Sequence, residues 1–187
     1  MLEGIVDFVR KIERLKKVER SGWKSWVGIE NPESVAEHSF ASAVLAMCIA
    51  DLKGLDAQKL VLMLLLHDIH EEIIGDYDYF AKKRIEENEL KKLEEEAIRK
   101  MLEGLPEKLA EKYLAIWAEF QEQKTIEAKI AKEIDHLEMI FQALEYENEG
   151  YNKDKLSVFW ENAEEKFKDE DLKQIFQLLK KRRNPDA

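Results

Sequence analysis

The feature that most constrains the fold of this chain is its scarcity of residues that interrupt a helix. Its 187 residues include three prolines, seven glycines and one threonine. Glu, Lys, Leu and Ala, which favour helices, are abundant throughout the sequence. No stretch alternates apolar and polar residues for long enough to predict a half-buried strand. The sequence therefore predicts an all-α fold.

Charge and cysteine content restrict the classes of function. With 40 acidic and 30 basic side chains the net charge is −10, which opposes attraction to nucleic acid or to an anionic membrane. The longest apolar run, 60–66, is shorter than the roughly 20 residues that cross a bilayer, and the first residues lack the apolar core of a signal peptide. Cys48 is the only cysteine, so a cysteine zinc cluster is excluded. We expect a cytoplasmic protein that binds neither nucleic acid nor membrane.

Apolar periodicity divides the chain into successive helices, and Ser34, Asp56 and Thr125 are predicted to cap three of them. The predicted helices cover about 2–17, 34–52, 57–74, 84–103, 106–121 and 125–148, followed by two short C-terminal helices capped by Asp154 and Asp169. The segments 19–32 and 76–83 are predicted loops. Because no repeat or linker interrupts this series, we expect a single helical-bundle domain over 1–187. Its motif-bearing core would lie at about 30–150, with the C-terminal helices at 153–182 packed on it.

The most informative segment is the end of the apolar helix, where the sequence HDIHEE (67–72) follows LMLLL (62–66). Two histidines and three acidic residues thus appear abruptly in what should be the most buried helix. Burial of a charged group costs several kcal/mol unless that group is paired or bound to metal. The segment therefore indicates either a metal site or a helix that emerges into water at this point.

Two further polar residues interrupt apolar faces of other predicted helices. His38 lies one turn into its helix, beside an inward-facing stripe, and by itself is typical of a buried core histidine. Asp135 interrupts the apolar pattern in the middle of the long helix from Thr125. Together with His67 and Asp68 they supply two imidazoles and two carboxylates from three helices. This mixed set of nitrogen and oxygen donors suits a divalent transition metal.

In chain order, His38, His67-Asp68 and Asp135 resemble the H…HD…D signature of the HD-domain metal-dependent phosphohydrolases. Local segments resemble one branch in particular, the YfbR-type 5'-deoxynucleotidases. These segments are RSGW (20–23), PESVAEH (32–38), HDIHE (67–71), GD (75–76) and KEID (132–135). The resemblance extends over about residues 5–180. It implies an HD-type helical bundle that hydrolyses deoxyribonucleoside 5'-monophosphates to a deoxynucleoside and phosphate.

The resemblance also implies a metal centre. His38, His67, Asp68 and Asp135 match the metal ligands, and Glu71 matches the acid/base residue. Helical spacing agrees with this assignment, because Glu71 lies four residues after His67 and three after Asp68, and such positions share one face of a helix. The resemblance implies one divalent transition metal ion, and the donor types accept Mn, Co, Fe, Ni or Zn.

Four more residues match substrate-binding or catalytic positions of that branch. Asp76 matches a residue that contacts the sugar or assists catalysis. Arg20 and Trp23 resemble a pair that holds the phosphate and senses the 2' position of the sugar. Here two residues separate them, whereas the bacterial sequences have them adjacent. Lys132, three residues before Asp135, is a further candidate for binding phosphate.

Other interpretations remain open from the sequence. An HD phosphohydrolase could act instead on a dNTP, a cyclic nucleotide or a guanosine polyphosphate, and a non-catalytic HD scaffold is a third possibility. Few basic residues near the motifs favour a small substrate such as a monophosphate. His70 could take part in a second metal site, although further histidines to complete one are lacking, and His136 is predicted to be a core residue. The resemblance implies a homodimer, for which Trp or Phe residues of the C-terminal helices are candidate contacts.

Overall fold

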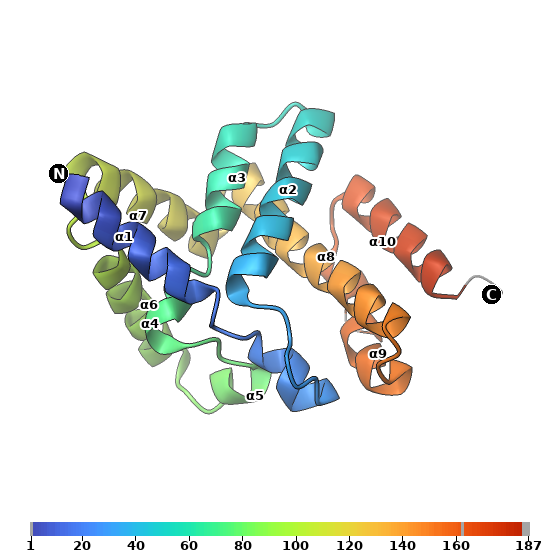
Figure 1. Ribbon diagram of the computed structural model, residues 1–187. Helices are drawn as coiled ribbons and strands as arrows, with labels where there is room; N and C mark the ends of the chain where they lie inside the picture. Colours follow the sequence, from blue (N-terminus) through green and yellow to red (C-terminus); the bar gives the residue numbers. More distant parts are fainter. Residues whose placement is uncertain (1, 162, 185–187) are drawn as a thin grey trace.

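The computed structural model of the protein describes residues 2–161 and 163–184 (Figure 1). Its helices are α1 (Leu2–Leu15), α2 (Val35–Lys53), α3 (Ala57–Leu66), α4 (Glu71–Ile74), α5 (Tyr79–Lys82), α6 (Glu87–Leu102), α7 (Glu107–Glu122), α8 (Ile126–Asn148), α9 (Lys153–Glu161) and α10 (Glu170–Arg183), with the shorter helical segments η1 (Trp23–Val27) and η2 (Glu164–Lys166). Within the described ranges there is no strand, only an isolated bridge between Glu19 and Ser34. The predicted all-α class is confirmed. Met1 and residues 185–187, which the predicted domain includes, lie outside the described residues.

Three helices, α2, α3 and α8, form the centre of the bundle (Figure 1). One apolar cluster, which includes Leu64, Ile134 and Phe176, joins these helices to η1, α9 and α10. A second cluster, which includes Leu66 and Ile98, joins the end of α3 to α1, α6 and α7. In Figure 1 the two groups of outer helices lie on opposite sides of the centre. The end of α3 is therefore enclosed from both sides, which explains how polar residues there come to be buried.

Side-chain caps fix the starts of the three central helices, as the sequence predicts. Ser34 accepts a hydrogen bond from the Glu37 N–H, and the Glu37 carboxylate accepts one from the Ser34 N–H. Asp56 accepts from the Lys59 N–H at the start of α3, and Thr125 caps α8 in the same way. Each such cap is worth about 1 kcal/mol. The caps thus set where each central helix begins, and with it the position of the residues that it carries.

The structure corrects several predicted boundaries. The helix predicted to reach residue 74 ends at Leu66, because residues 67–70 turn more tightly through bonds such as Ile69 N–H to Leu66 C=O before α4 begins. The predicted loop 76–83 contains α5, and the predicted loop 19–32 contains η1. Asn152, and not Asp154, caps α9, since its side chain accepts from the backbone at the start of that helix. Asp169 caps α10 as predicted.

One helix among the described residues, α2, is long and apolar enough to cross a membrane. In this protein 44% of its apolar window is buried inside the bundle. Central helices of helical bundles meet the same criterion of length and composition, so the finding is weak evidence for a span. The sequence interpretation, which considered only the run 60–66, overlooked this helix.

Candidate metal centre

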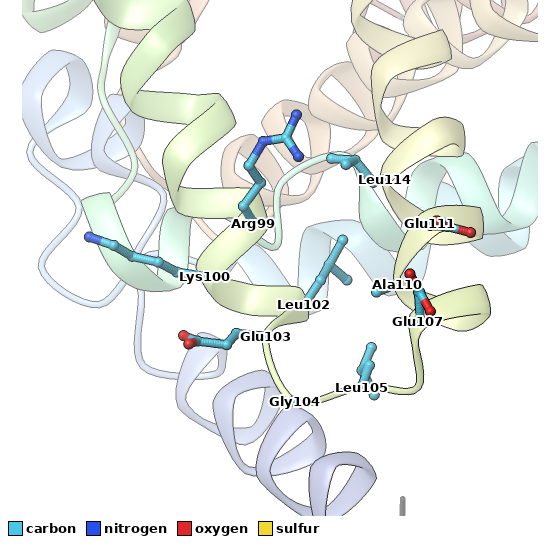
Figure 2. A pocket seen from close by; sticks show the side chains of 10 residues that line it. All are labelled: Arg99, Lys100, Leu102, Glu103, Gly104, Leu105, Glu107, Ala110, Glu111 and Leu114. Atoms are coloured by element: carbon cyan, nitrogen blue, oxygen red, sulfur yellow. The ribbon is translucent and has the colours of Figure 1, made fainter.

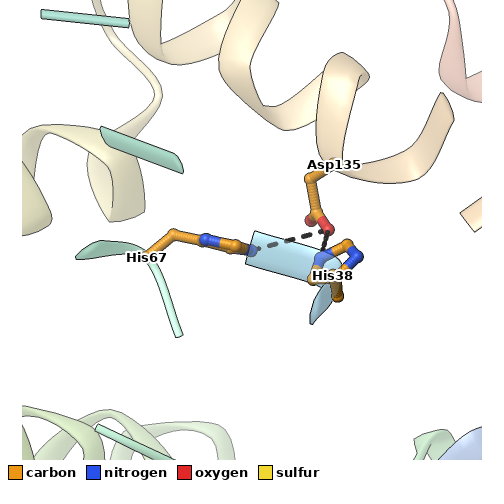
Figure 3. A group of neighbouring side chains, drawn as sticks. All are labelled: His38, His67 and Asp135. Atoms are coloured by element: carbon orange, nitrogen blue, oxygen red, sulfur yellow. Dashed lines mark hydrogen bonds and ion pairs between the residues drawn. The ribbon is translucent and has the colours of Figure 1, made fainter. Parts of the chain in front are cut away.

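His38 from α2, His67 from the end of α3 and Asp135 from α8 converge at the centre of the bundle (Figure 3). One potential ligand atom from each lies within 4.8 Å of the others. The Nε2 atom of His38 is 3.0 Å from Asp135 Oδ1, and that of His67 is 3.7 Å from the same oxygen. All three residues are buried. Three separate helices thus direct two imidazoles and one carboxylate at one point.

Asp68 adds a second carboxylate to this group. Its Oδ2 atom lies 3.0 Å from His67 Nε2 and 4.0 Å from His38 Nε2. The tight turn after α3 places it there, directly after His67 in the chain. The structure therefore brings together the four residues that the sequence nominates as metal ligands, and we name them the ligand cluster.

The hydrogen bonds of the two imidazoles indicate which ring nitrogen is free to bind a cation. His67 Nδ1 lies 2.8 Å from the backbone oxygen of Leu64, and His38 Nδ1 lies 2.5 Å from Glu138 Oε2. A ring that donates its Nδ1 proton to such an acceptor leaves a lone pair on Nε2. The buried Nε2 of His67 faces the carboxylates of Asp68, at 3.0 Å, and Asp135, at 3.7 Å, but neither contact has the geometry of a hydrogen bond. Lone pairs of imidazole and carboxylate groups therefore face one another, an arrangement that fits a bound divalent cation.

Electrostatics in the cluster favour positive charge. Burial disfavours the charged imidazole, but the carboxylates of Asp68 and Asp135 outweigh this effect and raise the pKa of His67 to about 9. Burial also disfavours the charged form of Asp135, yet Lys132, His38 and His67 hold its pKa well below the ordinary value. The cluster therefore keeps its carboxylates ionised at neutral pH, as metal ligands must be.

Two basic side chains stand beside the ligand carboxylates. A guanidinium nitrogen of Arg20 is 3.4 Å from Asp68 Oδ2, and its Nε is 3.9 Å from Glu33 Oε1. The ammonium of Lys132 is 2.8 Å from Asp135 Oδ2 and lies over the ring of Phe120. Both predicted phosphate-binding cations thus lie at the ligand cluster, where an anion bound to the metal would meet them.

Glu71, at the start of α4, is a buried acid with an unpaired oxygen. Its side chain is almost fully buried, and within the described residues Oε2 has no hydrogen-bond partner. Burial, followed by repulsion from Asp68 and Asp76, raises the pKa of Glu71 well above its ordinary value. A carboxyl group whose pKa is raised in this way holds its proton to higher pH than an exposed one, which suits the role of a general acid.

The other two predicted site residues, Asp76 and Trp23, contact residues outside the ligand cluster. Asp76 Oδ2 accepts hydrogen bonds from the N–H and the hydroxyl of Ser21, at 2.6 and 3.1 Å, and so ties the end of α4 to the Arg20 loop. Trp23 is only 2% exposed, its indole N–H donates to Glu33, and its ring packs against Tyr146. The structure therefore places Trp23 in the core and not at the ligand cluster.

Two candidate functional residues, Glu33 and Glu138, were not predicted from the sequence. Glu33 contacts both Arg20 and Trp23, and burial followed by repulsion from Glu138 raises the pKa of Glu33 to about 7. Glu138 contacts the ring of His38. The sequence could have indicated Glu138, because it lies three residues after Asp135 and hence on the same face of the helix. For Glu33 the available indication was its position just before a helix cap.

The remaining histidines lie away from the ligand cluster. His70 Nε2 is 4.0 Å from a carboxylate oxygen of Glu94, and its ring packs edge-on against Trp117. Burial lowers the pKa of both His70 and His136 to about 4. Among the described residues, neither belongs to a group that could hold a metal ion.

An open pocket of about 620 Å³ lies where α6 and α7 meet (Figure 2). Its lining residues fall within 99–114 and include none of the ligand cluster. A second pocket of about 400 Å³ lies between the start of α2 and α8 and is lined in part by Glu33, Glu138 and Tyr146. The first pocket therefore offers no chemistry related to the cluster, whereas the second is lined by Glu138, which contacts the His38 ring.

Comparison with known proteins agrees with this geometry. The HD domain family matches residues 12–176. The chain is 34% identical over 181 residues to 5'-deoxynucleotidase HDDC2 of Mus musculus, covering 97% of this chain and 89% of that protein. Among solved structures it resembles a conserved hypothetical protein from Pyrococcus furiosus, with a TM-score of 0.77, 29% identity and coverage of 94% of this chain and 99% of that one. It also resembles a protein from Pyrococcus horikoshii OT3, with a TM-score of 0.75, 30% identity and 96% coverage of both chains.

Proposed function

The chain belongs to the HD domain family, and on that premise we propose that it is a metal-dependent 5'-deoxynucleotidase. The reaction is hydrolysis of deoxyribonucleoside 5'-monophosphates to a deoxynucleoside and inorganic phosphate. The names of its curated relatives support the substrate class. The observation that carries the proposal is the ligand cluster itself, because buried lone pairs from three helices are costly unless a cation binds there.

In this proposal His38, His67, Asp68 and Asp135 hold one divalent metal ion. When bound, such an ion supplies a Lewis acid for the phosphoryl group and water activated near neutral pH. Imidazole and carboxylate donors accept Mn, Co, Fe, Ni and Zn with little discrimination. The proposed cofactor is therefore one transition metal ion of this set.

Arg20 and Lys132 bind the phosphate group in this proposal. Each already contacts a ligand carboxylate, so a small movement of the side chain transfers it to a phosphate oxygen next to the cluster. Charge-assisted hydrogen bonds of this kind are short and strong, and they stabilise the negative charge of the transition state. Two such cations suit one phosphate group, which favours a monophosphate over a triphosphate.

Glu71 acts as the general acid in this proposal. Its protonated carboxyl group gives a proton to the 5' oxygen as the bond to phosphorus breaks, so the nucleoside leaves as a neutral alcohol. Asp76 assists by holding the Arg20 loop through Ser21. We propose that Trp23 influences recognition of the sugar indirectly, through its hydrogen bond to Glu33 beside Arg20.

We also propose that residues 1–187 form one domain, located in the cytoplasm, that assembles as a homodimer. Of the C-terminal Trp and Phe residues, Trp160, Phe167 and Phe176 are buried, whereas Phe159 is partly buried. Large exposed apolar side chains occur instead on α2, where Phe40 is 67% exposed and Met47 is 48% exposed. Light scattering coupled to size-exclusion chromatography tests the dimer.

A phosphate-release assay tests the proposed function. The purified protein is stripped of metal and assayed on dNMPs, NMPs and dNTPs, with and without added Mn²⁺ or Co²⁺. We expect metal-dependent release from dNMPs, with less from NMPs. Bound metal with no hydrolysis of any monophosphate would contradict the proposal and favour a dNTP, a cyclic nucleotide or a guanosine polyphosphate as substrate.

A further inference from the structure

The rings of the two ligand histidines are held by acceptors of different kinds. His67 Nδ1 faces a backbone oxygen, that of Leu64, which any residue at position 64 would supply. His38 Nδ1 faces a side chain, the carboxylate of Glu138, at 2.5 Å. The orientation of His38 thus depends on the identity of one distant residue, which lies 100 positions away in the chain.

Helix α8 contacts both nitrogens of the His38 ring. Asp135 approaches Nε2 at 3.0 Å, and Glu138, one helical turn later, approaches Nδ1. Residues three apart share a helical face, so a single face of α8 determines both the position and the rotation of this ring. The His38 side chain is fully buried, and therefore water does not compete for either nitrogen.

The stability of the fold does not require an acidic side chain at position 138. It is buried and lies close to Glu33, which is also acidic, whereas an apolar residue would fill a core position of α8 without electrostatic cost. Two other buried acids of α8 differ in this respect, since Glu133 accepts two backbone N–H bonds and Glu147 pairs with Arg183. Among the described residues, the Glu138 carboxylate is hydrogen-bonded to the His38 ring.

The group formed by Glu33, His38 and Glu138 is not a second metal site. Two ligands of one tetrahedral ion lie roughly 3.3 Å apart, given metal–ligand distances of about 2.0–2.1 Å. The 2.5 Å between His38 Nδ1 and Glu138 Oε2 is shorter than this and is the distance of a hydrogen bond. A proton that the His38 ring donates from Nδ1 to this carboxylate would leave the Nε2 lone pair directed at the ligand cluster.

We propose that Glu138 is a positioning residue of the metal centre, which holds His38 in the tautomer and orientation that bind the ion. The inference rests on the proposed metal site but not on the proposed substrate. Loss of an outer hydrogen-bond partner of a metal-binding histidine typically weakens metal affinity about 10–100-fold. Glutamine can still accept the Nδ1 proton through its amide oxygen, so Glu138→Gln retains most of the affinity that Glu138→Ala loses.

The test measures metal binding without any nucleotide. The metal-free protein competes with a chromophoric chelator for Co²⁺ or Zn²⁺, and the dissociation constant is compared for wild type, Glu138→Ala and Glu138→Gln. We expect affinity to fall about 10–100-fold in the alanine variant, with substantial rescue in the glutamine variant. Glu133→Gln is the matched control, because it alters a buried acid of the same helix that does not contact a ligand, and its metal affinity should equal that of wild type.

A second measurement on the wild-type protein does not depend on how any variant folds. In the Zn²⁺-loaded protein, nitrogen-15 NMR of the histidine rings should find His38 metal-bound through Nε2, with a slowly exchanging proton on Nδ1. Binding through Nδ1, or wild-type affinity in folded Glu138→Ala, would overturn the inference and leave the proposed function intact. A wild-type protein that binds no divalent metal would overturn both, whereas metal binding without deoxynucleotidase activity would overturn the proposed function alone.

Discussion

The long helix α8 carries buried acids at two places, and their surroundings differ. Near its middle, Asp135 and Glu138 face the two nitrogens of His38, in a cluster that also holds an unpaired imidazole nitrogen. Near its end, Glu147 makes two hydrogen bonds to Arg183 of α10, at 2.9 and 3.0 Å. The guanidinium group also lies over the ring of Trp160, 4.9 Å from its centroid.

The buried acids in the middle of α8 therefore belong to the proposed metal site, whereas the one near its end stabilises the fold. At the C-terminal end each acceptor has its donor, and the ion pair fixes α10 against α8. In the middle, buried carboxylates and imidazoles from several helices meet at one point, and Arg20, Lys132 and the raised pKa of His67 balance their charge. Polar groups are commonly gathered in this way at sites that bind a ligand, at a cost in stability. We therefore expect substitutions at the two places to act on different properties.

Asp68→Ala should have the largest effect on activity. It removes one of the four proposed metal ligands, and we expect metal binding and phosphate release to be lost, with a fall in kcat/KM of more than about 1,000-fold. The melting temperature of the metal-free protein should fall less than in a variant that leaves a buried charge without any partner, because Arg20 keeps Glu33 and His67 keeps Asp135 nearby. Metal analysis and calorimetry on the same sample check both expectations, and full metal content in this variant would exclude Asp68 as a ligand.

Glu71→Gln should separate chemistry from metal binding. The amide cannot donate the proton that the buried carboxyl group supplies, so we expect kcat to fall about 100–10,000-fold. Metal content should remain that of wild type, because Glu71 is not among the proposed ligands. Steady-state kinetics with dNMPs and metal analysis test this, and a variant that retains its turnover would remove Glu71 from the role of general acid.

Arg183→Met should show the opposite behaviour. The side chain of Glu147 is 1% exposed, and removal of its partner leaves an uncompensated buried charge, at a cost of about 3–5 kcal/mol. In a protein of this size the melting temperature would fall by roughly 6–20 °C. Metal affinity should not change.

A double variant sharpens this comparison. Glu147→Met combined with Arg183→Met replaces the ion pair by apolar side chains, which buried sites often tolerate well. We expect it to recover most of the lost melting temperature. A reduced metal affinity in either variant would show that the ion pair near the end of α8 also influences metal binding in its middle.

His136 provides the smallest effect, an acid-dependent loss of stability. Its pKa is lowered by burial to about 4, so between pH 6.5 and 4 the unfolded chain binds more protons than the folded one. The free energy of unfolding therefore decreases as the pH falls through this window, by about 1–3 kcal/mol for this residue. Urea unfolding of wild type and His136→Gln at pH 7 and pH 4.5 measures it, and the variant should lose less stability than wild type. Equal losses would show that His136 is not the group responsible.

Much of the fold follows from local sequence. Three of the caps at the central helices were predicted because a side chain such as Ser34 or Asp56 bonds to a backbone N–H only a few residues away. The failures were local as well. The turn after Leu66 is formed by backbone hydrogen bonds between residues three apart, and the helix α5 is only one turn long. Such short elements leave little apolar periodicity in the sequence.

The ligand cluster was accessible from the sequence because its residues stand out. His38, the pair His67-Asp68 and Asp135 each interrupt an apolar helix, where an unpaired polar residue is costly. Their order along the chain resembles the HD signature, and the comparisons show that the chain belongs to the HD domain family. Sequence reasoning thus identified the residue types and their chemistry, but not the distances between them.

Only the tertiary structure determined the surroundings of these residues. The sequence alone did not reveal that Glu138 would meet His38, that Asp76 would bond to Ser21, or that Trp23 would be buried. These contacts join residues 55 to 100 positions apart or depend on how several helices enclose one side chain. Periodicity and capping depend on neighbours within about one helical turn, and therefore they determined the helices and the polar residues within them. The packing of α2, α3 and α8 decided which of those polar residues became a site.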